Sequence, residues 1–297
     1  MLILISDAFD RTLPEILSRY GEVTDDQSRL ADAEIVLVRS KTKVTAEYLD
    51  SAPRLRMVIR GGVGLDNIDQ ESAHKKGILV HNTAEASTTA VAELAFALMI
   101  DLASNVTKAD RSMREGKWLK KELERTELSG KILGILGLGR IGLALAARAR
   151  AFQMRVLGWH PDVYFTDVAE ILPTMKEVLQ RSDFVSLHVP LVPETRGMIN
   201  KQTLSDLKDG AYLINTCRGK ACIEEDVAAA LKSGKLAGFA TDVWYADPPE
   251  NSPLFEAPNC IFTPHIGAST KENMLRIGVI IERLIADYVK TMKRPTV

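Results

Sequence analysis

Three side chains in the second half of the chain have the types and settings needed to move a proton and to hold an anion. His265 stands in Thr-Pro-His-Ile-Gly, and an imidazole can give or take a proton near neutral pH. Asp247 follows an apolar run, and a carboxylate can orient an imidazole and stabilise its protonated form. Arg218 stands in Asn-Thr-Cys-Arg-Gly, where a guanidinium can bind a carboxylate through two parallel hydrogen bonds. Taken one at a time, they also fit a structural histidine, a polar proline-stiffened loop and a surface ion pair.

A glycine-rich turn precedes these residues in the chain. The run from Gly137 to Gly142 fits GxGxxG, with an apolar strand-like run before it and a helical pattern after it. The glycines then permit a tight turn, a close approach to a pyrophosphate and close helix packing, while the start of the helix favours negative charge. The alternative is a purely structural turn. The pattern predicts dinucleotide contacts at Gly137, Gly139, Arg140, Ile141 and Gly142.

His160 stands where an acidic residue usually binds the ribose of a dinucleotide, at the end of the next apolar run. No arginine or lysine lies between Gly158 and Thr166 to accept a 2′-phosphate, and Asp162 would repel that phosphate or bind the ribose directly. We therefore expect NAD as the cofactor, with a narrower preference over NADP than an acid at position 160 would give.

Short apolar runs alternate with polar helical patterns along the whole chain. This alternation is typical of parallel sheets with helices on both faces, whose ligands bind beyond the carboxyl ends of the strands. We expect two doubly wound α/β units and a closing amphipathic helix over about 271–290. The expected strands lie near residues 2–6, 34–40, 55–61 and 78–82 in the first unit, and near 131–137, 154–159, 183–190, 211–216, 237–243 and 260–265 in the second.

Composition excludes several classes of protein. A net charge of −1 over 297 residues argues against nonspecific binding to nucleic acid. Three scattered cysteines form neither a disulfide framework nor a metal-binding pair, so we expect no metal and a reducing, cytoplasmic location. The start, MLILISDAFD, predicts a first strand rather than a signal peptide, and no apolar run is long enough to span a membrane.

Six motifs in order along the chain resemble those of the D-isomer-specific 2-hydroxyacid dehydrogenases: RGGVGLDNID, TELSGKILGILGLGRIG, HVPLVPETRGMI, NTCRG, LKSGKLAGFATDVW and PHIGASTKEN. The resemblance covers nearly the whole length. It implies that Arg218, Asp247 and His265 are catalytic. It also implies a flavodoxin-like substrate domain, residues 1–91 with 270–297, into which a Rossmann domain for the dinucleotide is inserted over residues 92–269.

The resemblance extends the expected binding sites. Asp242 would help to position the nicotinamide carboxamide. Arg39 and Arg60 follow strands of the first unit and would hold the phosphate and carboxylate of the substrate, beside the backbone of Gly61, Gly62 and Val63. The alternative for the two arginines is a solvated basic rim. The other expected cofactor contacts are Pro190, Thr216, Cys217, Gly267 and Ala268.

Two departures from the family pattern stand out. The family's catalytic carboxylate is usually Glu, whereas Asp247 is one methylene shorter, so its contact with His265 would be longer, water-mediated or made by a backbone shift. The family often continues from Arg-Gly as GxxVDE, whereas this chain reads KACIEE, so Lys220 and Ile223 leave the pattern.

Within the family, the motifs are most like those of members that oxidise D-3-phosphoglycerate to 3-phosphohydroxypyruvate with NAD, the entry step of serine synthesis. The alternative substrates are glyoxylate, hydroxypyruvate or another small 2-keto acid. A non-enzymatic alternative is an NAD-sensing corepressor-like protein. The resemblance also implies a homodimer, with the long apolar helix after residue 87 and the KWLKK segment (117–121) near the partner subunit. The alternative for KWLKK is an exposed amphipathic loop.

Overall fold

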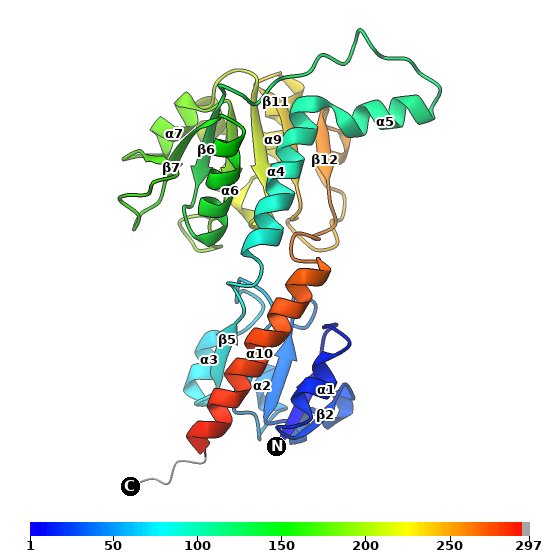
Figure 1. Cartoon of the computed structure of the whole chain (residues 1–297), viewed down its shortest axis with the longest axis vertical. Helices are drawn as coiled ribbons and strands as arrows, with labels where there is room; N and C mark the ends of the chain where they lie inside the picture. The colour runs from blue at the N-terminus through cyan, green and yellow to red at the C-terminus, as the bar shows by residue number, and fades with distance from the viewer. Residues whose placement is uncertain (293–297) are drawn as a thin grey trace. The chain divides into compact units, whose positions relative to one another are not determined.

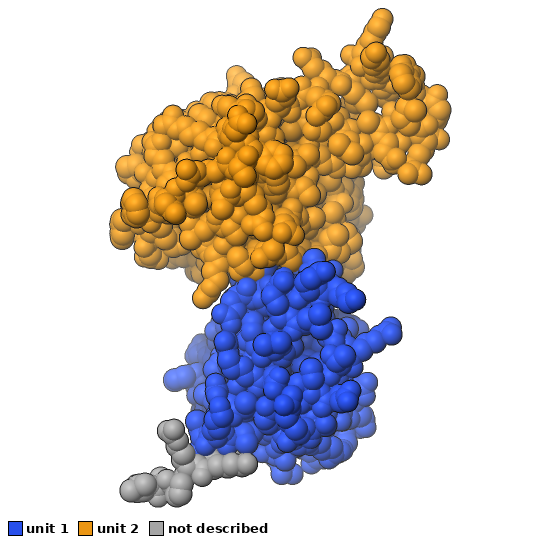
Figure 2. Space-filling model, in the orientation of Figure 1, with its two compact units in different colours: residues 1–87, 268–297 blue, residues 88–267 orange. Residues whose placement is uncertain are grey.

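The computed structural model describes residues 1–292 and separates the chain into two compact units (Figure 2). Unit 1 contains residues 1–87 and the segment that begins at Ala268. Unit 2 contains Thr88–Gly267. Each unit has its own parallel sheet and its own hydrophobic core on both faces of that sheet.

The sheet of unit 1 has the strand order β2-β1-β3-β4-β5, with every pair parallel. Side chains alternate between its faces: Ile3 and Leu37 pack beneath the helix α10, while Leu4 and Val36 pack beneath α2 and α3. The strands are β1 (Leu2–Ile5), β2 (Glu22–Thr24), β3 (Ile35–Val38), β4 (Met57–Arg60) and β5 (Leu79–Asn82). The helices are α1 (Leu13–Leu17), the 3-10 helix η1 (Gln27–Asp32), α2 (Ala46–Asp50), α3 (Gln70–Lys75) and α10 (Lys271–Met292).

The sheet of unit 2 has seven parallel strands in the order β12-β11-β10-β9-β6-β7-β8. The chain runs outward from β6 through β7 to β8 and then returns to β9 on the other side of β6. Ligands of such sheets bind at this reversal, beyond the carboxyl ends of the strands. The strands are β6 (Ile132–Leu136), β7 (Arg155–Trp159), β8 (Glu170–Ile171), β9 (Phe184–Leu187), β10 (Ala211–Asn215), β11 (Leu236–Thr241) and β12 (Cys260–Phe262).

Helices cover both faces of the second sheet. The helices α4 and α6 contribute to the core on one face, and α7, α8 and α9 to the core on the other. Their bounds are α4 (Thr88–Ser104), α5 (Val106–Arg114), α6 (Arg140–Ala151), α7 (Met175–Arg181), α8 (Lys201–Ser205), η2 (Gly219–Ala221), α9 (Glu224–Lys232) and η3 (Pro253–Glu256). The predicted architecture of two parallel-sheet α/β domains is confirmed.

The helix α5 and the chain that follows it extend away from the sheet of unit 2 (Figure 1). Val106, Met113 and Trp118 expose apolar surface on this arm, which we define as residues 105–127. Over residues 1–292 no single helix combines the length and apolar character that a membrane crossing needs. The helices α4 and α5 meet those two criteria only as a pair, and the chain bends by 62° between them.

Replacing Gly134 with alanine tests the packing of the central strand β6. A Cβ there would clash with Val178 Cγ1 and Ser182 Oγ, which belong to the α7 segment that covers the sheet. We expect Gly134→Ala to lower the free energy of unfolding by about 1–3 kcal/mol, measured by urea titration. The control is Gly278→Ala in α10, whose Cβ would meet Leu13 Cδ1 at an ordinary 3.5 Å. It should be neutral or stabilising by up to ~1 kcal/mol, and an equal loss in both variants would contradict the packing argument.

Candidate active site

The glycine turn between β6 and α6 has the shape that a dinucleotide needs. Gly137 has a φ of 100°, a backbone conformation that favours glycine. A Cβ at Gly142 would clash with the carbonyl oxygen of Gly137, whereas one at Gly139, the N-cap residue, would meet no atom within 4 Å. No side chain of the described residues caps α6, so the N–H groups of its first turn, from Arg140 and Ile141, face the turn. The site is therefore open and electropositive where a pyrophosphate would lie.

The loop after β10 carries a buried polar atom that a ligand could satisfy. The Thr216 residue is only 8% exposed, and its Oγ1 is buried without a hydrogen-bond partner in residues 1–292. Burying a hydroxyl without a partner is costly, so a polar group of a bound ligand is the natural partner. The neighbouring Cys217 donates its thiol to Asn215 Oδ1 at 3.2 Å, and burial raises the pKa of that thiol. The Cys217 side chain beside Thr216 is therefore an uncharged thiol.

His160 follows β7 at the carboxyl edge of the same sheet. Its Nδ1 accepts the backbone N–H of Asp162 at 3.0 Å, so a neutral ring carries its proton on Nε2. Arginines near this loop are already engaged: Arg155 pairs with Glu170 at 2.5 Å, and Arg150 donates to the carbonyl of Asp167. Pro190 follows β9 and uses its carbonyl to accept from Thr195 Oγ1 at 2.6 Å.

His265 and Asp247 form a direct pair. The distance from His265 Nδ1 to Asp247 Oδ2 is 2.6 Å, and both side chains reach solvent. The shorter aspartate thus contacts the ring without a water molecule and without a long gap. Because Nδ1 faces the carboxylate, it carries the proton of a neutral ring, and Nε2 is the nitrogen left for a substrate.

A buried carboxylate holds the loop that carries His265. Asp242 is 2% exposed, and its Oδ1 accepts from Thr263 Oγ1 at 2.7 Å and from the backbone N–H of Ile266 at 2.8 Å. Its Oδ2 accepts the N–H of Gly267 at 2.8 Å. Between these anchored neighbours His265 has a φ of 56°, in the left-handed region. Ala268 begins the second segment of unit 1, where its carbonyl accepts from Asn273 at 2.7 Å.

Arg218 lies at the end of β10, in a loop fixed by Asn215. The amide of Asn215 donates to the Arg218 carbonyl at 2.9 Å and accepts the Cys217 N–H at 3.1 Å. Arg218 Nη1 donates to the Cys217 carbonyl at 2.6 Å. The structure therefore brings Arg218, His265 and Asp247 to loops at one edge of the sheet, together with the glycine turn.

Arg39 belongs to unit 1 and follows β3. Asp7 accepts the backbone N–H of Arg39 and both the N–H and the hydroxyl of Thr42, while the amide of Asn67 donates to the carbonyls of Arg39 and Thr42 at 2.8 Å each. The guanidinium is partly buried, which lowers the pKa of Arg39, and nearby Asp7 opposes that effect. Its Nε is buried without a partner in the described chain, so the group suits an anionic ligand.

Arg60 is at the end of β4, as predicted, but it is only 8% exposed. Its Nη1 donates to the carbonyl of Gly64 and lies 3.1 Å from where a Cβ of Gly62 would be. The guanidinium thus holds the loop formed by the next four residues. Gly61 packs against the ring of Phe9, and the Val63 carbonyl accepts from Asn82 at 2.6 Å.

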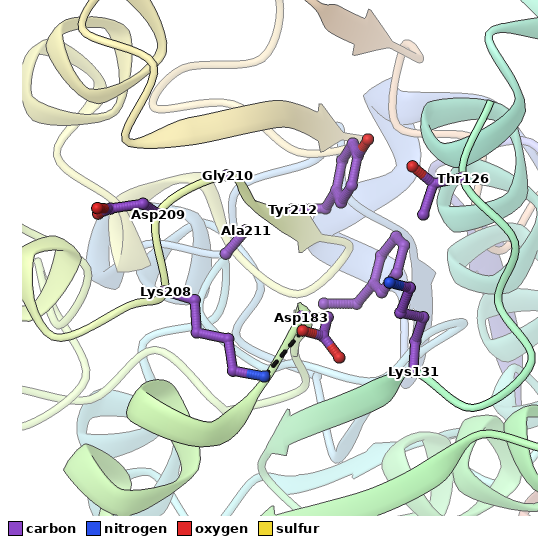
Figure 3. Close-up of a pocket in the computed structure, with 9 residues that line it drawn as sticks. Thr126, Lys131, Asp183, Lys208, Asp209, Gly210, Ala211 and Tyr212 are labelled. Carbon is purple, nitrogen blue, oxygen red and sulfur yellow. Dashed lines mark hydrogen bonds and ion pairs between the residues drawn. The ribbon is translucent and has the colours of Figure 1, made fainter. Parts of the chain in front are cut away.

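A separate cavity of about 240 Å³ lies at the amino ends of β6, β9 and β10, the opposite edge from the glycine turn (Figure 3). None of the residues predicted for catalysis or cofactor binding lines it. Lys208 pairs with Asp183 at 2.8 Å, and the rings of Phe184 and Tyr212 stack at 4.7 Å. These contacts stabilise that edge of the sheet. Across residues 1–292, no group of three or more His, Cys, Asp or Glu side chains is placed to hold a metal ion.

Comparison with known proteins places this geometry in a family. Residues 96–267 match the model of the D-isomer specific 2-hydroxyacid dehydrogenase, NAD binding domain. The chain belongs to this family. Its Rossmann unit is therefore an NAD-binding domain, and the turn, the helix start and the orphan hydroxyl of Thr216 fit that cofactor.

Relatives named for different substrates all resemble the chain. It is 39% identical to D-3-phosphoglycerate dehydrogenase of Methanocaldococcus jannaschii, over 98% of this chain and 57% of that protein. It is also 39% identical to hydroxypyruvate reductase of Thermotoga maritima, over 92% of this chain and 90% of that protein. The crystal structure of Aquifex aeolicus D-lactate dehydrogenase complexed with NAD and lactic acid has a TM-score of 0.87 and 29% identity, covering 98% and 96% of the chains. The chain thus spans little more than half the length of the matched phosphoglycerate dehydrogenase.

Sequence reasoning missed the residues that hold the loops. Asp7, Asn67 and Asn215 are polar residues whose side chains bind backbone groups of the predicted site residues. Each of them had a usable signal, because Asp7 follows the first strand closely. Asn67 and Asn215 stand inside the motifs RGGVGLDNID and NTCRG, whose resemblance to the family was noted without assigning these two side chains a role.

His188 gives a stability test that does not depend on catalysis. Burial lowers the pKa of His188 from 6.5 to about 4, and its Nε2 contacts Ser186 Oγ at 2.9 Å. The unfolded chain binds a proton below about pH 6.5, whereas the folded one does so only near pH 4, so stability falls as pH drops through that window. Between about pH 6.5 and pH 4 we expect the free energy of unfolding, measured by urea titration, to fall by roughly 1–3 kcal/mol, and by less in His188→Gln. If the unchanged chain and His188→Gln lost stability equally over this pH range, the pH dependence would not come from His188.

Proposed function

We propose that the protein is an NAD-dependent dehydrogenase that oxidises D-3-phosphoglycerate to 3-phosphohydroxypyruvate. The observation that carries the proposal is the direct contact of 2.6 Å between His265 and Asp247, at the same edge of the sheet as the NAD-binding turn. The family supports the reaction class. The similarity to D-3-phosphoglycerate dehydrogenases supports the substrate, as does the partly buried Arg39, a cation suited to a phosphate.

His265 is the proposed base. NAD, when bound, supplies the acceptor for the hydride that leaves C2 of the substrate. His265 Nε2 takes the proton of the C2 hydroxyl, and in the reverse direction it returns that proton to the carbonyl oxygen. Asp247 keeps the imidazole oriented through Nδ1 and stabilises the imidazolium that forms. Proton and hydride leave different atoms, so both are accounted for.

Arg218 is the proposed holder of the substrate carboxylate, and it polarises the C2 oxygen. The bonds of Asn215 keep its loop in place while the guanidinium meets the substrate. Asp242 positions His265 through its bonds to the backbone of Ile266 and Gly267. The nicotinamide carboxamide would lie near Asp242.

Reduction of hydroxypyruvate or glyoxylate is a second candidate. It is favoured by the match to the hydroxypyruvate reductase of Thermotoga maritima, which extends over 90% of that protein. We also propose a homodimer in which the arm contacts the second copy, because Trp118 and Met113 expose large apolar surfaces there. We also propose a cytoplasmic location, because the proposed reaction uses a soluble dinucleotide and an anionic metabolite.

Removing the imidazole tests the reaction directly. We expect His265→Ala to lower kcat by roughly 10²–10⁴-fold in both directions, with cofactor affinity changed little, because proton transfer is lost. Asp247→Asn should lower the rate of carbonyl reduction and move its alkaline limit to lower pH. Steady-state kinetics across pH, with cofactor binding followed by fluorescence, measure these effects. Turnover of His265→Ala within tenfold of the unchanged protein would remove His265 from the mechanism.

The two arginines predicted to bind the substrate, Arg39 and Arg60, should respond differently to replacement by alanine. We expect Arg39→Ala to reduce kcat/KM for 3-phosphoglycerate by about tenfold or more, and for D-glycerate much less, because a phosphate gains more from a cation than a hydroxyl does. Arg60→Ala should weaken every substrate, since Arg60 holds the backbone beside the predicted carboxylate site. The panel also includes hydroxypyruvate and glyoxylate. Equal losses for Arg39→Ala across the panel would exclude a phosphate contact.

The cofactor preference should be moderate. His160 Nε2–H can donate to the ribose of either cofactor, while Asp162 repels a 2′-phosphate, so we expect NADH to be preferred over NADPH. His160→Asp should widen the preference by adding a second repelling charge. The measurement is kcat/KM for both cofactors at about pH 8, where an imidazole is neutral. A lead for NADPH would show that a cation from elsewhere reaches the ribose.

A further inference from the structure

One carboxylate anchors both ends of the loop that carries Asp247. Glu224, the first residue of α9, accepts the backbone N–H of Tyr245 through Oε1 at 3.3 Å. Its Oε2 accepts the hydroxyl of Ser252 at 2.6 Å. Tyr245 stands two residues before Asp247, and Ser252 five residues after it. Glu224 therefore closes residues 245–252 into a loop held at both ends, which we call the carboxylate loop.

The far anchor is firm. Ser252 is 7% exposed, and its Oγ also accepts the N–H of Leu254 at 3.3 Å, capping the helix η3. Leu254 is buried in the core of unit 2. The bond from Glu224 thus ties the carboxylate loop to a fixed point of the unit rather than to a mobile side chain.

The near end of the loop packs against the segment that follows Arg218. A Cβ at Gly219 would clash with the carbonyl group of Trp244, so the two backbones touch. The ammonium of Lys220 lies 5.0 Å from the centre of the Tyr245 ring, a cation–π contact. Arg218, at the head of this segment, and Asp247 are therefore joined through Glu224, Lys220 and the backbone.

Two acidic side chains differ in length from the family pattern, one shorter and one longer. Asp247 stands where the family pattern has Glu and is one methylene shorter. Aligning KACIEE with GxxVDE puts Glu224 where the pattern has Asp, one methylene longer. The longer side chain holds the carboxylate loop from α9, and the shorter one must still reach His265, which it does at 2.6 Å.

We propose that Glu224 is a positioning residue whose extra methylene compensates for the short Asp247. Its longer side chain lets the carboxylate loop lie farther from α9 and nearer to His265, so that Asp247 meets Nδ1 directly. Glu224 itself touches neither substrate nor cofactor. The proposal rests on the proposed function only for its kinetic readout, because the contact between His265 and Asp247 can be observed in the protein without substrate.

The test is a swap of the two lengths. Four proteins are compared: the unchanged chain, Glu224→Asp, Asp247→Glu and the double variant. We expect each single change to lower kcat for the reduction of 3-phosphohydroxypyruvate and hydroxypyruvate by on the order of tenfold, with KM for NADH within about twofold. The double variant should recover to within about threefold of the unchanged chain, because the total reach is restored.

The control variant is Glu225→Asp, which makes the same chemical change at the next, exposed position of α9. It should leave kcat within about twofold, since acidic residues at a helix start are interchangeable in their effect on the helix dipole. Thermal unfolding of all variants shows whether a loss of rate comes from loss of fold. A stable Glu224→Asp protein with unchanged kcat would overturn the proposal, as would losses that simply multiply in the double variant.

A spectroscopic readout separates this inference from the proposed reaction. In protein labelled with ¹⁵N-histidine, the short bond of His265 Nδ1–H to Asp247 should give a downfield proton signal, assigned by its absence in His265→Asn. The signal should weaken in Glu224→Asp and return in the double variant. Its persistence in Glu224→Asp would refute the positioning role. If this pattern holds but no substrate turns over, the proposed reaction fails and the inference stands.

Discussion

The buried carboxylate of Asp242 is the interaction on which the rest of the site depends. Its two oxygens hold Thr263, Ile266 and Gly267, so the backbone on both sides of His265 is fixed. His265 has a left-handed backbone conformation, which costs about 1–2 kcal/mol for a residue with a Cβ. The anchored neighbours hold that conformation, and it aims the imidazole before any ligand binds. Asp247 then decides which ring nitrogen stays available.

In each unit, the carboxylate of one aspartate holds a loop by accepting its backbone N–H groups. In unit 1, Asp7 accepts backbone N–H groups of Arg39 and Thr42, as Asp242 does in unit 2 for the loop of His265. A partly or fully buried carboxylate is tolerated only when several donors satisfy it, so each of these acids needs its loop as much as the loop needs the acid. The proposed phosphate-binding Arg39 and the proposed base His265 are therefore both presented by anchored loops at the carboxyl ends of parallel strands. Rigid presentation suits a reaction that needs proton and hydride transfers aligned.

Much of the fold was predictable because the period of the apolar residues reports burial on both faces of a parallel sheet. Elements without a buried apolar run were missed for the same physical reason. The edge strands β2 and β8 are short and at least partly exposed, and α5 lies on the protruding arm with only Ser112 buried, so none of them shows such a run. Arg60 was predicted at the correct strand end, but its buried position and its bond to Gly64 depend on the path of the loop after β4.

The sequence by itself determined the fold class, the family, the dinucleotide turn and the chemical types of the site residues, because these depend on local spacing and on ordered motifs. The tertiary structure alone decided the reach of Asp247 to His265, the anchoring by Asp242 and Asp7, and the closure of the carboxylate loop by Glu224. Each of these joins residues 18 to 35 positions apart. Such contacts depend on how strand ends converge and on differences of a single methylene, which no local pattern of residues records.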